Sequence, residues 1–413
     1  MTEDNSLRSG LRLIFATFLP HFAVSLAMGA VGPLAPFLQA DLGLNRAQIG
    51  ALISVHSLGW VVMALVAGSI VEHSGIRFWV FLCPAVTGVL VFFFMGISSY
   101  IWAAIIFLLM GFAFSFINPA TTKALVMGFS RVGRGTAVAI KQTGTPSGVF
   151  LAAACLPAIA VAGGWQWGMA FVAVVNIVVG VCAWLLYRER QDDFNGSGQG
   201  RRTSFRHDLG LLLHNRNFML VSILQGVFNI GQFVIQSYLV LYLVESIGYS
   251  TIYAGFVMAV TQFSGVVGRL VWGAMSDFIF GGRRVPTLIA AGVATVIGLS
   301  GLALIGTGTP AWVIWIIASL AGAGSIGFAG TAILLRAELT GKELAATSTG
   351  LGMAISAWGV LVGPPVFGLI VDTTHSYRLS WWIITAISLA ATLLLGLIRE
   401  KKYSGPASQA AGA

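Results

Sequence analysis

The chain has 413 residues, of which 57% are apolar and only 9% are charged, and its formal net charge is +9. Soluble domains carry about 25% charged residues, so this composition excludes an ordinary soluble domain. The mean hydropathy of +0.88 indicates an integral membrane protein instead.

Apolar runs recur along the whole chain, each long enough to cross a bilayer core of about 30 Å. Since the backbone polar groups of a span must be satisfied internally in lipid, we expect an all-α fold of twelve transmembrane helices in two six-helix bundles. The expected spans are 11–38, 47–70, 78–98, 101–123, 135–162, 166–187, 216–245, 252–277, 286–306, 310–336, 344–371 and 378–398. The expected parts are an N-terminal segment (1–10), a first bundle (11–187), a linker (188–215), a second bundle (216–398) and a tail (399–413).

The positive charge is unevenly distributed between the two sides of these spans. Of the 23 Lys and Arg, all but Arg46, Arg378, Lys141 and Arg269 fall on the side of both termini. This bias follows the positive-inside rule and explains the net charge better than nucleic-acid binding does. It predicts a multi-pass protein of the bacterial inner (plasma) membrane with both termini cytoplasmic. The first helix is too long for a signal peptide and is expected to be retained.

No feature of the chain indicates a metal or a cofactor. Cys83, Cys155 and Cys182 fall inside predicted helices and lack the spacing of metal ligands. We therefore expect no cofactor and no bound metal, and a monomer whose surroundings are the lipid bilayer.

The first two spans each carry a histidine. His21 shares a face of the first helix with Ser25, Gly29 and Gly32, and His56 lies in the second helix. Because the histidine pKa lies near neutrality, both are candidates for proton coupling, and His21 is also a candidate substrate ligand. The alternative is a hydrogen-bonded packing role.

The fourth and fifth spans carry a second polar group. Asn118 shares a helix face with Ser115 and Thr122, and the fifth span contains consecutive Lys141, Gln142 and Thr143. A charge at bilayer depth costs about 2.5–3.5 kcal/mol on insertion scales, so it usually faces a polar cavity. Lys141, Gln142 and Asn118 are therefore candidate substrate ligands. A lysine that reaches the membrane surface along its flexible stem is the alternative.

The second bundle repeats this pattern after a Gly- and Ser-rich linker. In the seventh span, Gln225, Asn229, Gln232 and Gln236 follow a helical spacing and predict a polar wall. Arg269 lies in the eighth span, and its planar guanidinium matches a carboxylate. It could instead bind backbone carbonyls or reach the surface. Aromatic residues that could form apolar walls include Phe22, Phe114, Phe116, Phe328 and Trp358, the last a candidate ligand.

The two bundles also repeat a loop. Gly68-x-x-x-Glu72-x-x-Gly75-x-Arg77 follows the second span, and Gly273-x-x-x-Asp277 with Arg283 and Arg284 follows the eighth. At these residues the chain resembles the major facilitator superfamily over residues 10 to 400, although Glu72 stands where that family usually has Asp. The resemblance implies alternating access. It also implies gating by ion pairs near the cytoplasmic surface, formed by Glu72, Arg77, Arg134, Asp277, Arg283, Arg284 and Arg336.

The resemblance extends to Arg269, which resembles the carboxylate-binding arginine of monocarboxylate and oxalate/formate-type carriers. The family's layout implies that the helices of Lys141 and Arg269 face each other across the bundles. Because two cations without a membrane-embedded acid indicate an anionic partner, we expect proton-coupled uptake of a small organic anion, a carboxylate. The alternatives are an exporter of anionic or neutral drugs or metabolites and, from another class, a non-transporting membrane receptor or enzyme. No convergent set of catalytic groups favours an enzyme.

Overall fold

The computed structural model describes residues 3–129, 134–188, 205–341, 344–398 and 400. Within that part of the chain the fold is helical, and twelve helical stretches are long and apolar enough to cross a membrane, as predicted. The first half comprises α1 (Glu3–Gly29), α2 (Val31–Leu42), α3 (Arg46–His73), α4 (Ile76–Phe94), α5 (Tyr100–Gly128), α6 (Arg134–Gly163) and α7 (Trp165–Leu186).

The second half contains a short helix ahead of its spans. It comprises α8 (Phe205–His214), α9 (Arg216–Glu245), α10 (Thr251–Ala274), the π-helical turn η2 (Met275–Ile279), α11 (Arg284–Leu304), α12 (Ala311–Ser325), α13 (Phe328–Thr340), α14 (Ala345–Ser356), α15 (Trp358–Thr374) and α16 (Tyr377–Leu395). Helix α8 occupies part of the expected linker. It packs one face against the rest of the second half, since Leu212 is buried while the neighbouring Leu211 and Leu213 stay exposed.

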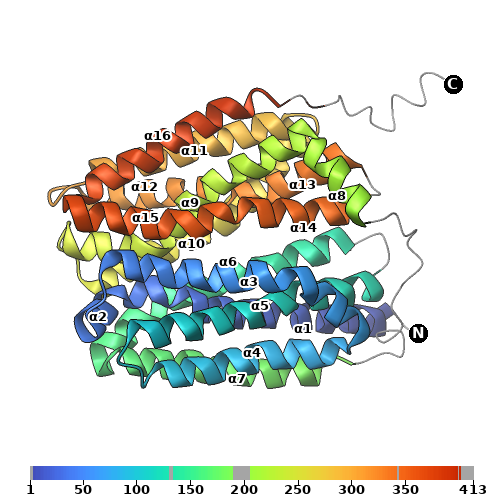
Figure 1. Cartoon of the computed structure of the whole chain (residues 1–413), viewed down its shortest axis with the longest axis horizontal. Coiled ribbons are helices and arrows are strands. Elements are labelled where there is room, and N and C mark those ends of the chain that lie inside the picture. Colours follow the sequence, from blue (N-terminus) through green and yellow to red (C-terminus); the bar gives the residue numbers. More distant parts are fainter. Residues whose placement is uncertain (1–2, 130–133, 189–204, 342–343, 399, 401–413) are drawn as a thin grey trace.

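The two halves lie side by side, and both ends of the chain emerge at the same end of the molecule (Figure 1). We call this end the terminal face and the opposite end the distal face. Polar side chains cap many of the helices. Asn45 forms a capping box with Gln48 at the start of α3, and Ser99, Asn215, Ser250 and Ser376 cap α5, α9, α10 and α16.

Three spans are broken in mid-course. The first span changes direction at Ala30, between α1 and α2, where the ring of Pro33 conflicts with the carbonyl of Gly29. The tenth span is interrupted at Ile326–Gly327 and the eleventh at Ala357. Each break frees backbone carbonyls from the helical ladder, and in lipid these carbonyls need other partners.

Glycines permit the closest approaches around two of these breaks. A β-carbon at Gly32 would overlap the carbonyl oxygen of Gln236, so α2 packs directly on the backbone of α9 across the two halves. A β-carbon at Gly359 would overlap the carbonyl oxygen of Gly226 in the same way, which brings α15 against α9. The core of the molecule therefore contains backbone as well as side-chain packing.

Candidate functional site

Lys141 lies at the centre of a polar cluster in the first half. Its side chain is fully buried, and Nζ donates to Oδ1 of Asn118 at 2.8 Å and to Oγ1 of Thr122 at 2.9 Å, both on α5. Both partners are neutral, so the described contacts leave the charge uncompensated. An ammonium has three donors, and the third has no partner here. The structure thus joins two of the predicted ligands, Asn118 and Lys141.

His21 belongs to the same cluster. Its Nε2 lies 3.0 Å from Oγ1 of Thr121, next to Thr122, while its buried Nδ1 has no partner. The close packing of α1 on α6 depends on Gly144, where an added β-carbon would lie 3.0 Å from the His21 β-carbon. Gly144 is one helical turn from Lys141. One ring nitrogen of His21 therefore stays available beside the lysine.

His56 lies elsewhere. It is buried between α3 and α5, with its ring 5.6 Å from the ring of Phe114, and Nε2 has no hydrogen-bond partner. None of its described contacts joins it to the Lys141 cluster. The structure therefore brings one of the two candidate histidines, His21, to the cluster and leaves His56 in a packing position.

Arg269 connects the second half to the first. From α10, its Nε donates to the carbonyl of Ile326 at 3.2 Å, at the break of the tenth span. Its Nη1 reaches the carbonyl of Gln142 on α6 at 3.4 Å. Gln142 is the direct neighbour of Lys141 on α6, so the two intramembrane cations lie at a similar depth, with Lys141 directed to α5 and Arg269 at the contact between α6 and α10. The guanidinium is partly exposed and retains donors beyond these two contacts.

The four amide side chains of α9 lie in different environments: Gln225, Asn229, Gln232 and Gln236. Nδ2 of Asn229 donates to the carbonyl of Ser356 at 2.9 Å, at the break of the eleventh span. Gln225 and Gln236 are buried, each with one unpartnered amide atom, and Gln232 is partly exposed. Trp358 donates from Nε1 to the carbonyl of Ile223 at 3.3 Å. In this conformation, then, Asn229 and Trp358 bind backbone carbonyls of the second half.

The predicted gating residues at the terminal face make contacts inside each half. Arg77 donates to the carbonyl of Trp184 at 3.0 Å and stacks over its ring. Arg284 binds Asp277 and, at 3.0 Å, Glu338. Asp277 thus pairs with Arg284 here and not with Arg336, another of the predicted gating residues. The side chains of Glu72 and Arg134 lie outside the described residues.

Arg336 is the most unusual of these residues. Its side chain is fully buried on α13 against Gly352 of α14, and none of its three guanidinium nitrogens has a hydrogen-bond partner.

Arg283 is exposed at the start of α11, and no ion pair involves it among the described residues.

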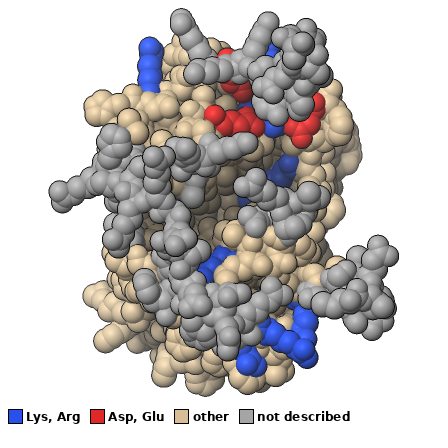
Figure 2. Space-filling view, turned by 90° about the vertical axis from the view of Figure 1, so that its right-hand side faces the viewer, with Lys and Arg blue, Asp and Glu red and all other residues tan. Residues whose placement is uncertain are grey.

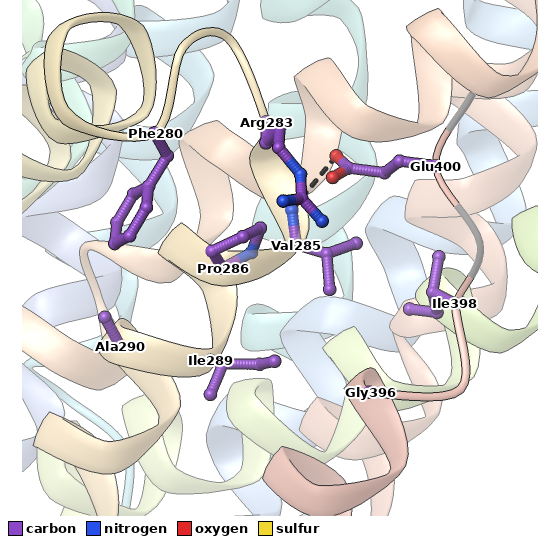
Figure 3. Close-up of a pocket in the computed structure, with 9 residues that line it drawn as sticks. All are labelled: Phe280, Arg283, Val285, Pro286, Ile289, Ala290, Gly396, Ile398 and Glu400. Atoms are coloured by element: carbon purple, nitrogen blue, oxygen red, sulfur yellow. Dashed lines mark hydrogen bonds between the residues drawn. The ribbon is translucent and has the colours of Figure 1, made fainter. Parts of the chain in front are cut away.

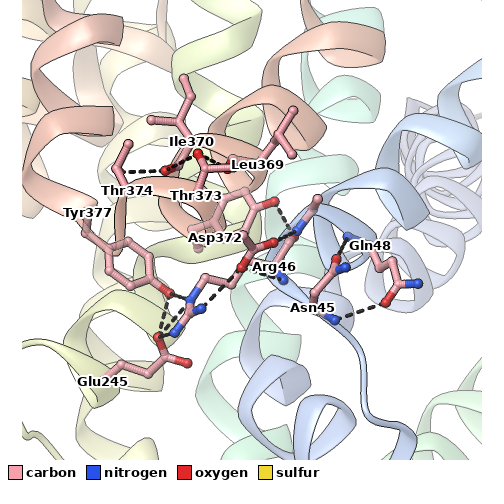
Figure 4. A network of polar contacts seen from close by, with 12 residues as sticks. Asn45, Arg46, Gln48, Glu245, Leu369, Ile370, Asp372, Thr373, Thr374 and Tyr377 are labelled. Carbon is pink, nitrogen blue, oxygen red and sulfur yellow. Dashed lines mark hydrogen bonds and ion pairs between the residues drawn. The ribbon is translucent and has the colours of Figure 1, made fainter.

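At the distal face a network of charges crosses between the halves (Figure 4). Arg46, at the start of α3, pairs with Glu245 of α9 at 2.7 Å and with Asp372 of α15 at 3.2 Å. Tyr377 lies within 3.0 Å of Nε of Arg46 and within 2.8 Å of the Glu245 carboxylate. We call these four residues the Arg46 network.

Backbone groups extend this network. The Asp372 carboxylate accepts from the backbone N–H of Arg46 at 3.3 Å and of Ala47 at 2.9 Å, so a side chain of one half caps a helix of the other. The hydroxyl of Tyr238 lies 2.7 Å from the carbonyls of both Arg46 and Pro364. Deeper in the same interface, Oγ of Ser54 donates to the carbonyl of Val360 at 2.8 Å.

Sequence reasoning missed the Arg46 network. Its signal was present, because Arg46 is one of two bases expected on that side and Glu245 and Asp372 end two spans there. What the sequence lacked was the pairing between elements that lie 199 and 326 residues apart.

The two faces of the molecule therefore differ in how the halves meet. Among described residues, the inter-half hydrogen bonds belong to the Arg46 region, to Ser54 and to Arg269. Figure 2 looks onto the terminal face and shows it hollowed between the halves, with Lys and Arg atoms visible in the recess. An anion entering from this face would meet positive charge. The described residues contain no cluster of His, Cys, Asp or Glu suited to a metal ion.

Comparison with known proteins agrees with the fold. The model of the "Major Facilitator Superfamily" matches residues 17–364 and 271–412. An uncharacterized transporter of this type from Mycobacterium tuberculosis is 27% identical, over 90% of this chain and 81% of its own. The membrane sensor protein UhpC of Escherichia coli is 26% identical, over 89% and 87%. The "Probable L-galactonate transporter" of Escherichia coli is 25% identical, over 88% and 83%.

Solved structures show the same architecture. The D323A mutant of the nucleoside transporter NupG superposes with a TM-score of 0.78 at 14% identity, covering 95% of this chain and all of its own. A bacterial homologue of the human lysosomal transporter Spinster, inward-facing and unoccupied, also gives 0.78 at 16% identity, over 96% and 98%. These likenesses establish the arrangement of helices.

Proposed function

Since the chain belongs to the major facilitator superfamily, a family of membrane transporters, we propose that it takes up a small organic anion by proton-coupled alternating access. The observation that carries this proposal is the approach of Arg269 to Gln142, which brings the two intramembrane cations to one level between the halves. Neither cation has an acidic partner among the described residues, so their charge is free to attract an anion.

We assign Lys141 and Arg269 different roles, because their hydrogen bonds differ. Lys141 is held by neutral oxygens of Asn118 and Thr122 and acts as a fixed positive charge in the first half. Arg269 keeps donors free and offers a planar fork that fits a carboxylate. An anion bound by both would draw the two halves together. Gln232, Gln142 and the free nitrogen of His21 complete the proposed lining, and His21 is the proposed proton carrier.

The names of the relatives support a hydroxylated acid as the substrate class. Besides the "Probable L-galactonate transporter", they include a hexuronate transporter and a "Probable galactarate/D-glucarate transporter" of Bacillus subtilis. All three names describe sugar acids. The amides of Gln142 and Gln232 would suit the hydroxyl groups of such a substrate, because an amide both donates and accepts.

A thermal-shift screen of the purified protein tests the binding site. A ligand that binds the folded state at about 100 times its Kd stabilises it by about 2.7 kcal/mol. We expect sugar acids to raise the Tm at pH 5.5 and 7.5, and neutral sugars and cationic drugs to leave it unchanged. Arg269→Ala should abolish this shift, and Arg269→Lys should retain part of it because the charge remains.

Arg378→Ala is the matched control, because Arg378 is an exposed arginine at the distal face outside the proposed site. Its ligand-induced shift should equal that of the unchanged protein. An undiminished shift in both Arg269→Ala and Lys141→Ala would refute the proposed site. Stabilisation by cationic or neutral compounds alone would favour an exporter.

The similarity to a membrane sensor keeps a second candidate open, namely a binding protein that does not transport. Uptake of a radiolabelled sugar acid into proteoliposomes separates the two. We expect accumulation inside vesicles when the outside is acidic, and a loss of accumulation when the pH gradient is dissipated. Binding without uptake would favour the sensor, and uptake without pH dependence would exclude proton coupling.

A further inference from the structure

A second site lies outside the central interface. A cavity of about 440 Å³ opens at the terminal face where η2, α11 and the end of α16 meet (Figure 3). Its lining is largely apolar, with Phe280, Pro286, Ile289 and Ile398 among the contributors. Two charged residues, Arg283 and Glu400, also line it.

The position of this cavity corresponds to the headgroup level of a bilayer. The candidate spans around it end at Ile279 and Leu395 and begin at Arg284. Large apolar side chains beside it point outward: Phe278 is 88% exposed, Leu393 is 71% exposed, and Ile279 and Leu397 are also exposed. In a membrane protein such side chains contact lipid, so the cavity opens among lipid-facing residues at the edge of the second half.

Each of the two charged side chains in the cavity has polar atoms without a protein partner among the described residues. One carboxylate oxygen of Glu400 accepts from the backbone N–H of Arg284 at 2.6 Å and of Val285 at 3.0 Å, which caps the start of α11. The other oxygen, Oε2, is buried and has no partner. The guanidinium of Arg283 has no hydrogen bond or ion pair among the described residues, and it is not paired with Glu400.

We propose that this cavity binds a phospholipid whose headgroup carries a primary amine. The phosphate lies against Arg283, and the ammonium donates to Oε2 of Glu400. The upper part of an acyl chain lies along Phe280, Pro286 and Ile289.

Charge complementarity selects this occupant. A buried carboxylate oxygen without a partner needs a donor, and an ammonium supplies one while an unpaired guanidinium receives the phosphate. A choline headgroup has no N–H to donate, and a glycerol headgroup brings no cation to Glu400. The proposed lipid therefore brings Glu400 both a cation and an N–H donor, whereas choline lacks the donor and glycerol lacks the cation.

Native mass spectrometry of the full chain, equilibrated with equal amounts of phosphatidylethanolamine, phosphatidylcholine and phosphatidylglycerol, tests this site. We expect the unchanged protein to retain phosphatidylethanolamine in preference to both others. Glu400→Gln should reduce that preference roughly tenfold, as the loss of one charge-assisted hydrogen bond predicts. Arg283→Gln should instead lower the retention of all three lipids, because each of them carries the phosphate that Arg283 binds. The glutamine at 400 keeps an oxygen that can cap α11, and melting curves check that the variants remain folded.

The matched control is Arg378→Gln, which removes an exposed arginine at the opposite face and should leave lipid retention unchanged. Equal retention of phosphatidylethanolamine and phosphatidylcholine by the unchanged protein would overturn the proposal. A preference for phosphatidylglycerol that persists in Glu400→Gln would also overturn it, because the site would then recognise negative charge through Arg283 alone.

Discussion

The terminal and distal faces carry similar charged residues but use them differently. At the distal face, Arg46 of the first half pairs with Glu245 and Asp372 of the second. At the terminal face, Arg284 pairs with Asp277 and Glu338 of its own half. The same chemistry joins the halves at one end and organises a single half at the other.

This difference indicates which end of the molecule opens. The halves are tied together at the distal face, and the terminal face is hollowed between them (Figure 2). The structure therefore corresponds to a transporter state that is accessible from the side of its termini. In the orientation that the positive-inside rule predicts, this is the inward-facing state. In the alternating access proposed above, the opposite state would require the Arg46 network to separate. Substitutions in this network therefore test the difference between the two faces.

Arg46→Ala should have the largest effect. It leaves two carboxylates close together without a cation, and we expect a loss of about 2 kcal/mol in the stability of this state. Opening of the distal face would follow. A cysteine at Ser54, introduced after replacement of Cys83, Cys155 and Cys182, should then react faster with a membrane-impermeant maleimide added from the distal side.

Arg284→Ala is the counterpart at the terminal face and should leave the labelling of that cysteine unchanged. Its partners are largely exposed, and exposed ion pairs contribute about 0–1 kcal/mol. Equal labelling rates in the Arg46 and Arg284 variants would contradict the assignment of the closed face.

Tyr377→Phe should have an intermediate effect. The change removes one hydroxyl that contacts both Arg46 and Glu245 while keeping the ring that packs on Phe367 and Tyr242. We expect a loss of about 1 kcal/mol, measured as a lower Tm, and a modest rise in Ser54→Cys labelling. A Tm shift without any change in labelling would show that the hydroxyl supports the second half alone.

Asp277→Asn should have the smallest effect on this conformation. The Asp277 side chain is 58% exposed and pairs within its own half, so we expect a change of about 0.5 kcal/mol or less. Transport should be reduced more than stability if Asp277 gates the opposite state, and proteoliposome uptake compared with the Tm measures both. Unaltered uptake would remove Asp277 from the proposed gate.

The sequence predicted the number and the placement of the spans because both depend on local information. About 20 apolar residues in succession suffice to specify a membrane helix. The breaks at Ala30, Ile326–Gly327 and Ala357 were not predicted. They depend on close backbone packing, such as that of Gly32 on α9, which a single helix does not reveal.

The candidate site was predicted in part, and the reason differs from residue to residue. Lys141 and Asn118 were predicted separately as polar residues of two spans, and the contact between α5 and α6 brings them into one cluster. Arg269 binds the backbone carbonyls of Ile326 and Gln142, which is the alternative that the sequence left open, and its role as a substrate ligand stays a prediction. For Asn229 and Trp358, the helix breaks provide carbonyl partners that no sequence pattern could specify.

The cap that Asp372 places on α3 has a consequence for observation in solution. The amide hydrogens of Arg46 and Ala47 are held by a carboxylate from the other half, so they are shielded only while the distal face is closed. Opening of the distal face would expose these two amides to water, and their hydrogens would then exchange with deuterium. Hydrogen–deuterium exchange at the first turn of α3 should therefore report opening of the distal face without any added label.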